Sequence, residues 1–306
     1  MLQVSQIQRP RQQASPLAAN WGYPALRYQI QSEFYLLPGL LMIKQFFKPT
    51  SLEEAMIIKE KYGDAITWFA GGAYFNHISF QARYDKVIGL EGLGLHAIHT
   101  KGSQTSIGAT VTLQKLIDNS IVPKALRKAA SQATTRTVRN MATVGGDIAV
   151  AGKKSALIPC LIALKASVVT AGKKNVPVES YIQSSERDLI LKVMLPEQET
   201  RCFTNQYTLK ANSPALVRVA TSIDSDNDSK RKSLSIAIGG LEEQPRRLTK
   251  IEEHIRGQGK VDYDAIVDAV SKDVEPEADI YGSVPFKKYI SGITVADCVL
   301  SCLEEE

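Results

Sequence analysis

The chain has 306 residues, of which 44% are apolar and 23% are charged, and its formal net charge is +5. This length allows a well-buried core and predicts two domains, because single cores rarely grow far beyond this size. No apolar run approaches the ~20 residues of a membrane-spanning helix, so we expect a soluble protein with no membrane partner. The positive charge is too small to indicate a nucleic-acid partner.

Four cysteines, at positions 160, 202, 298 and 302, are too scattered for a dense disulfide framework. They include no Cys-x-x-Cys pair, so we assign no metal site and no iron–sulfur cluster to this chain. Cys298 and Cys302 lie one helical turn apart in an apolar stretch and are expected to be packed thiols. This cysteine usage fits a reducing, cytoplasmic setting.

Residues 1–41 differ from the rest of the chain, since they are rich in Gln and Pro and have little periodicity. Their apolar cluster FYLLPGLL is too late and too short for a secretory signal, and it contains a proline. We expect this segment to be a disordered arm or a stretch upstream of a true start at Met42. Its scarcity of acidic residues leaves a transit peptide as an alternative.

The first recognisable element follows Met42. Ser51 and Glu54 form a capping box that predicts an amphipathic helix running to Gly63. AITWFAGG then predicts a buried strand that runs into a glycine turn, and KVIGL predicts a second strand. A hairpin is expected around Lys101–Gly102.

Helices and strands continue to alternate as far as Pro196. Thr112 is expected to open one helix and Pro123 a second one. SALIPCLIALKA predicts a buried helix, and both SVVTAGKKNVPVESY and DLILKVMLP predict strands. Two further strand regions and then helices from Pro245 follow, so we expect an α+β fold with domains at 42–196 and 197–306.

Two Gly-Gly pairs stand out as candidates for ligand binding. Gly71–Gly72 follows a buried strand, and Gly145–Gly146 is expected in a loop between two helices. Backbone without a Cβ can approach a diphosphate closely and offer several N–H donors. Neither pair matches a dinucleotide GxGxxG turn or a phosphate-binding GxxxxGK loop. Gly239–Gly240 is expected to be a simple turn.

From Met42 to about Leu303 the chain resembles the FAD-binding medium subunit of the xanthine dehydrogenase and carbon monoxide dehydrogenase family of molybdenum hydroxylases. The matching segments, in the family's order, are FFKPTSLEEA, WFAGGAYFN, TSIGATVTLQKL, VRNMATVGGDIA and IGGLEEQPRRL. The resemblance implies a two-domain FAD-binding fold of the PCMH and vanillyl-alcohol-oxidase type. It also implies an α+β C-terminal domain like that of carbon monoxide dehydrogenase flavoproteins.

The resemblance also implies a function and a cofactor site, with no catalytic side chain. The chain would be an oxidoreductase subunit, active in complex, that accepts electrons from the clusters of an iron–sulfur subunit beside a molybdopterin subunit. Its FAD would pass them to NAD or another acceptor. The FAD-contacting residues would be Trp68, Phe69, Ala70, Gly71, Gly72, Ala73, Tyr74, Phe75, Gly108, Ala109, Thr110, Arg139, Thr143, Val144, Gly145, Gly146, Asp147, Ile190 and Tyr207. For Arg139, a purely structural hydrogen-bonding role is equally expected.

Three positions depart from the family pattern. Ala73 replaces a hydroxyl residue, Asp147 replaces an asparagine and would bring a carboxylate towards the diphosphate, and Ala156 replaces an aspartate. Lys153 and Lys154 offer either compensating phosphate contacts or a solvated loop. These departures keep open an alternative, a non-catalytic partner or assembly protein with a degenerate flavin site. A stand-alone flavin oxidase would need an acid–base residue that we cannot nominate.

Overall fold

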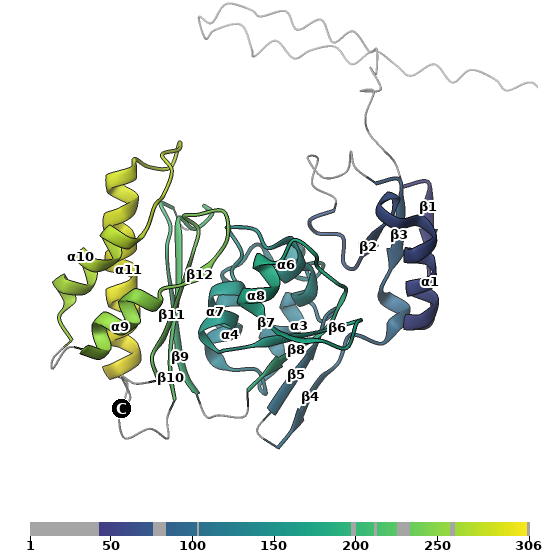
Figure 1. The fold of residues 1–306 in the computed structure, drawn as a ribbon, viewed down its shortest axis with the longest axis horizontal. Helices are drawn as coiled ribbons and strands as arrows, with labels where there is room; N and C mark the ends of the chain where they lie inside the picture. The colour runs from purple at the N-terminus through teal and green to yellow at the C-terminus, as the bar shows by residue number, and fades with distance from the viewer. Residues whose placement is uncertain are drawn as a thin grey trace, which may run out of the picture. The chain divides into compact units, whose positions relative to one another are not determined.

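The computed structural model describes residues 43–75, 84–102, 104–196, 200–210, 213–224, 233–257 and 261–304. All of these belong to a single unit, Gly39–Glu306. The expectations for the segment 1–41 therefore lie outside the described residues. Within this unit the chain forms three successive sheets, each with its own helices (Figure 1). This mixture of helices and sheets confirms the α+β expectation.

The first sheet is small and parallel. Its strand order is β1-β3-β2, with β3 paired to both neighbours in parallel. Helix α1 connects β1 to β2, and Ala55, Ile66 and Ile88 form the centre of a small core between the helix and the sheet. The elements are β1 (Gln45–Phe47), α1 (Leu52–Tyr62), β2 (Thr67–Phe69) and β3 (Lys86–Gly89).

The capping of α1 follows the sequence prediction at both ends. The Ser51 hydroxyl accepts a hydrogen bond from the Glu54 amide at 3.2 Å. The Glu54 carboxylate reaches one residue further back than in a standard capping box and accepts from the Thr50 amide at 2.8 Å. Gly63 ends the helix with a positive φ of 53°, a conformation that favours glycine.

The second sheet has five antiparallel strands in the order β4-β5-β8-β6-β7. Gly102, with φ of 62°, forms the turn of the predicted hairpin between β4 and β5. The strands are β4 (Ile98–Lys101), β5 (Gln104–Gly108), β6 (Ser167–Thr170), β7 (Asn175–Pro177) and β8 (Ile190–Leu195). The helices in this part are α3 (Leu113–Asp118), α4 (Lys124–Ser131), α5 (Arg136–Arg139), α6 (Val144–Val150), α7 (Ile158–Ala163) and α8 (Val178–Gln183).

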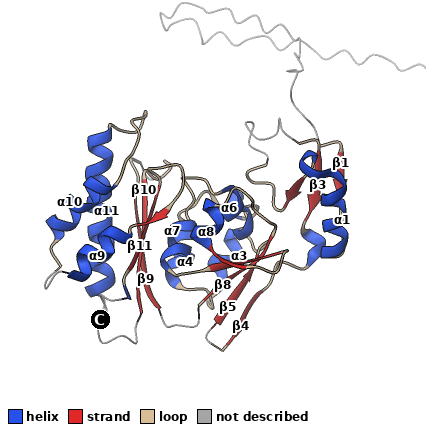
Figure 2. Cartoon of the chain, viewed as in Figure 1, coloured by secondary structure: helices blue, strands red, loops and turns tan. Residues whose placement is uncertain are grey.

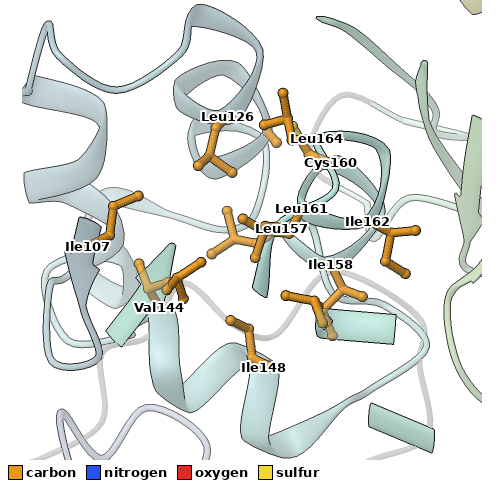
Figure 3. Packing of buried hydrophobic residues seen from close by; sticks show 14 of the residues in the cluster. Ile107, Leu126, Val144, Ile148, Leu157, Ile158, Cys160, Leu161, Ile162 and Leu164 are labelled. Carbon is orange, nitrogen blue, oxygen red and sulfur yellow. The ribbon is translucent and has the colours of Figure 1, made fainter. Parts of the chain in front are cut away.

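The largest core lies between this sheet and its helices. Side chains of α7 converge on Ile107, Val144 and Ile148, as Figure 3 shows. Every residue of α7 is buried, which confirms the buried helix that was predicted there, although the helix itself is shorter than the apolar run. An apolar helix without a polar face must be enclosed on all sides, and here the third sheet and helices α4 and α8 contact it.

The third sheet is antiparallel, in the order β12-β11-β10-β9. Both of its faces are covered: α11 packs on β9 and β10 from one side, while α7 packs on β10 and β11 from the other. Figure 2 shows the sheet between these two groups of helices. The elements are β9 (Thr200–Tyr207), β10 (Val217–Asp224), β11 (Ser235–Gly239), β12 (Arg246–Arg247), α9 (Thr249–Gly257), α10 (Tyr263–Asp273) and α11 (Val284–Glu304).

Three local predictions were wrong. The segment after Pro177 is helix α8 rather than strand, because the buried positions Val178, Tyr181 and Ile182 have helical spacing. Gly145–Gly146 does not lie in a loop but in the first turn of α6. The helices do not begin at Pro245: Arg246–Arg247 forms β12, with Arg246 paired with Glu242 and Asp273 at 2.8 and 2.9 Å, and the first helix that follows, α9, begins at Thr249.

The cysteines behave as packed thiols, as predicted. Cys160, Cys298 and Cys302 are fully buried in the described structure. Burial raises the pKa of Cys298 to about 12, so its thiol stays protonated. No described helix is both long enough and apolar enough to cross a bilayer.

Candidate functional site

A cavity of about 680 Å³ opens beside both glycine pairs. It is bounded by the segment that follows β2, by the start of α6, and by the segment that leads into β8. Protein sites for small molecules and cofactors commonly measure ~300–1,000 Å³, so this cavity has room for a large organic cofactor. The walls are mostly backbone and apolar side chains.

The first glycine pair lies directly after β2. A Cβ on Gly71 would overlap the backbone carbonyl of Met141, and Gly72 has a positive φ of 71°. Both positions therefore require glycine. Within the described part of the chain, the amides of Gly71, Gly72 and Ala73 donate to no protein acceptor. This segment thus brings three candidate N–H donors to the cavity wall.

The second glycine pair contributes close approach instead of free donors. The Gly145 amide donates to the Ala109 carbonyl at 2.8 Å, and a Cβ on Gly145 would lie only 2.7 Å from that of Ala109. The Gly146 amide donates to the Thr143 hydroxyl at 3.1 Å, which caps α6. The expectation that both pairs would offer inward-turned amides is therefore wrong for the second pair, whose helical turn uses them.

Asp147 is held by the segment that follows α6. The Ser155 hydroxyl donates to the Asp147 carboxylate and accepts from the Ile158 amide at 3.0 Å. Burial raises the pKa of Asp147, while Ser155 and the positive charge of Arg218 on β10 oppose this rise only in part. The carboxyl group that was expected to repel a diphosphate is therefore hydrogen-bonded to the protein, and burial raises its pKa.

Two other charged residues of the cavity wall form hydrogen bonds to the backbone. Arg187 donates to the backbone carbonyls of Ala149, Ser184 and Ile182 at 2.8 to 3.2 Å. Asp188 accepts from the Gly172 and Leu189 amides at 2.6 and 2.8 Å. Its carbonyl accepts from the Tyr181 hydroxyl, and burial raises the pKa of that phenol to about 12. These groups fix the entry to β8.

The cavity gathers most of the predicted site residues. Those that line it are Trp68, Phe69, Ala70, Gly71, Gly72, Ala73, Tyr74, Phe75, Ala109, Thr143, Gly145, Gly146, Asp147 and Ile190. Five do not line it. Gly108 and Thr110 lie beside the segment at Leu95, and Val144 is fully buried in the core. Arg139 and Tyr207 lie outside the lining as well.

Arg139 and Tyr207 make other contacts. Arg139 donates to the carbonyls of Ser131 and Thr134 at 2.7 and 2.9 Å, the structural role that was weighed for it. Tyr207 lies on β9, where its ring packs edge-on against Phe286 with centroids 6.2 Å apart. Neither side chain is placed at the cavity in this structure.

Sequence reasoning missed part of the cavity wall. The segment Arg187–Leu189, just before Ile190, lines it, as do Val138 and Met141 just before Thr143. Their position next to predicted site residues was the available signal. Ala156, a departure from the family pattern, and Lys154, which was weighed for compensating phosphate contacts, line it as well.

Comparison with known proteins shows the family to which the chain belongs. Residues 41–198 match the family described as "FAD binding domain in molybdopterin dehydrogenase", and residues 205–301 match "CO dehydrogenase flavoprotein C-terminal domain". The chain belongs to the FAD-subunit family of the molybdenum hydroxylases. This confirms the resemblance and its two-part fold.

The relatives of this chain align with different shares of its length. The uncharacterized protein YgfM of Escherichia coli (strain K12) is 32% identical over 261 residues, which cover 85% of this chain and 97% of YgfM. The glyceraldehyde dehydrogenase medium chain of Sulfolobus acidocaldarius is 24% identical over 64% of this chain and 75% of its own. The carbon monoxide dehydrogenase structure from Hydrogenophaga pseudoflava shares the fold, with a TM-score of 0.76 and 21% identity over 85% of this chain and 96% of that one.

The cavity residues fit the cofactor of the FAD-subunit family. A dinucleotide diphosphate needs backbone that can approach it closely and N–H donors, and Gly71 to Ala73 offer both. The volume of the cavity is also sufficient for this cofactor. The mostly apolar walls suit an aromatic ring system.

Proposed function

We propose that this chain is the FAD-carrying electron-transfer subunit of a molybdenum hydroxylase. It receives electrons from an iron–sulfur subunit, which stands beside a molybdopterin subunit, and passes them through FAD to NAD or another acceptor. Without the iron–sulfur subunit this chain would receive no electrons, so it works in a complex. The enzyme is xanthine dehydrogenase-like in this arrangement.

One observation carries the proposal: Gly71, Gly72 and Ala73, whose backbone amides donate to no acceptor among the described residues, line a cavity of about 680 Å³. Consecutive amides of this kind bind anionic oxygens without any positive side chain. They are held in place because Gly71 packs directly on Met141, which ties the first glycine segment to the segment leading into α6.

The role of the protein's own residues would be to bind FAD and to orient it. The amides of Gly71 to Ala73 would hold the diphosphate, and the turn at Thr143 would pack against it through the small residues Gly145 and Gly146. Tyr181, whose phenol stays neutral, fixes the Asp188 carbonyl and with it the entry to β8. When bound, FAD would supply the chemistry of one- and two-electron transfer.

The identity of the partners and of the acceptor rests on family membership. The name "nicotinate dehydrogenase FAD-subunit" of Eubacterium barkeri, a relative that is 29% identical over 41% of this chain, describes such a component of a larger enzyme. We propose the same arrangement here, with NAD as one candidate acceptor.

A direct test is to purify the chain together with proteins that associate with it in its native cell. The proposal expects FAD, iron, acid-labile sulfide and molybdenum in the complex, and bleaching of the flavin absorbance when substrate is added. A complex without iron or molybdenum would contradict the electron-transfer role. Adding NAD to the reduced complex then tests the acceptor.

One alternative keeps specific support, namely a non-catalytic partner or assembly protein on the same fold. Ala73 offers no hydroxyl group to a phosphate, and the amides of Gly145 and Gly146 are already bonded within the protein. A chain that binds its partner subunits but no FAD would establish this alternative.

A further inference from the structure

The segment between α6 and α7 is fixed at two points. The Lys153 carbonyl accepts a hydrogen bond from the Gly240 amide at 2.7 Å, which ties the segment to the end of β11. Two residues later, Ser155 donates to Asp147 on α6. Lys154 lies between these anchors, so its backbone is held on both sides.

Lys154 is the residue of this segment, between the two anchors, that lines the cavity. It lines the cavity together with both glycine pairs, and its ammonium nitrogen lies 5.3 Å from the ring centroid of Tyr281. Among the described residues the ammonium group has no hydrogen-bond acceptor and no carboxylate partner. The cation–π contact with Tyr281 leaves the N–H donors of Lys154 unused.

The other charged groups of the cavity wall are committed elsewhere. Arg187 donates to backbone carbonyls, and the carboxylate of Asp188 accepts from backbone amides. Asp147 is bonded to Ser155. Lys154 is thus the charged group of the described cavity wall that has its donors free for a ligand.

We propose that Lys154 binds the diphosphate of FAD and supplies the positive charge that the glycine segments cannot. This inference rests on the proposed function. At neutral pH the diphosphate carries the negative charge of FAD, whereas the oxidised isoalloxazine ring is neutral, so the ammonium group of a cavity-lining lysine would be attracted to the diphosphate. The adjacent Lys153 has the same charge but does not line the cavity.

The test compares Lys154→Met with Lys154→Arg and Lys153→Met in the purified, flavin-free full chain. Calorimetry with FAD, ADP and riboflavin as separate probes measures each dissociation constant. We expect Lys154→Met to weaken FAD and ADP by about ten- to a hundredfold, as loss of one charge-assisted hydrogen bond does. Riboflavin, which lacks phosphate, should bind as it does to the wild type.

The control variants and the salt dependence complete the test. Lys153→Met, with the same loss of charge, should bind FAD like the wild type, and Lys154→Arg should recover most of the affinity. The salt dependence of FAD binding should be weaker for Lys154→Met than for the wild type. Equal FAD affinity of Lys154→Met and wild type, or an equal loss for riboflavin, would overturn the assignment to the diphosphate. If the wild type binds no FAD, both this inference and the proposed function fail.

Discussion

The backbone carbonyl of Met141 occupies the space in which a side chain on Gly71 would begin. These residues belong to the two glycine-containing segments, so their contact holds the cavity walls together. We predict that Gly71→Ala forces them apart, lowers stability by about 1–3 kcal/mol, as overpacking does, and abolishes tight FAD binding. Thermal unfolding and FAD titration measure the two effects.

The matched control for this change is Gly257→Ala at the end of α9. A Cβ there would meet no atom within 4 Å, so this variant should keep both its stability and its FAD affinity. If Gly71→Ala behaves like Gly257→Ala, the close contact with Met141 is not a determinant of the site.

Thr143 connects the cap of α6 to the cavity. Its hydroxyl accepts from the Gly146 amide, and it pairs with Thr112 in an isolated bridge. Thr112 likewise caps α3, accepting from the Lys115 amide at 3.2 Å, but does not line the cavity. We predict that Thr143→Val and Thr112→Val each lose about 1 kcal/mol of stability, seen in thermal unfolding.

FAD titration should separate these two cap variants. Only Thr143→Val should weaken FAD binding, because only that change releases the first turn of α6 beside the ligand. Equal affinities in both variants would show that the capped turn does not contact FAD.

Asp147 should make stability depend on pH. Burial raises its pKa in the folded state, so the protonated folded form is favoured. The stability that this group contributes is complete below the ordinary aspartate pKa of about 3.9 and is lost as the pH rises through the raised value. We therefore predict that Asp147→Asn, measured by thermal unfolding, gains stability relative to the wild type between acid and neutral pH.

Asp64→Asn is the matched control for that change, because it removes the same charge at an exposed position. A difference between Asp147→Asn and the wild type that stays constant from acid to neutral pH would contradict the raised pKa. The raised pKa would also be contradicted if the stability of the wild type, relative to that of Asp147→Asn, increased with rising pH.

The thiols should stay unreactive in the folded protein. Cys160, Cys298 and Cys302 are fully buried, and a hydrogen bond with Cys160, together with burial, raises the pKa of Cys202. At neutral pH we predict that a thiol reagent modifies at most Cys202 in the native protein and all four cysteines after denaturation. Cys202→Ser should abolish any fast reaction. Two or more fast thiols per folded chain would refute this packing.

Much of the fold was predictable because local signals agreed with the tertiary structure. Ser51, Thr112 and Pro123 marked helix starts correctly, since capping depends on neighbouring residues only. The order of the matching segments along the chain then indicated the family and its two-part fold. The domain boundary at 196 and 197 stays a prediction.

The errors came where distant contacts decide the structure. The Gly145 amide is used by the Ala109 carbonyl, which is distant in the sequence, so the Gly-Gly pair alone did not show that it begins a helix instead of a loop. The partner of Asp147 was likewise hidden, because Ser155 meets it only after the chain turns. The site residues remain predictions, with Tyr207 and Arg139 placed away from the cavity.

The central claim is that the glycine-lined cavity holds FAD. The most direct measurement is a titration of FAD into the flavin-free wild-type chain, followed by flavin absorbance and fluorescence. We predict saturation at one FAD per chain, with a shifted visible spectrum. No flavin in the purified protein, and no saturable change after FAD is added, would contradict the claim.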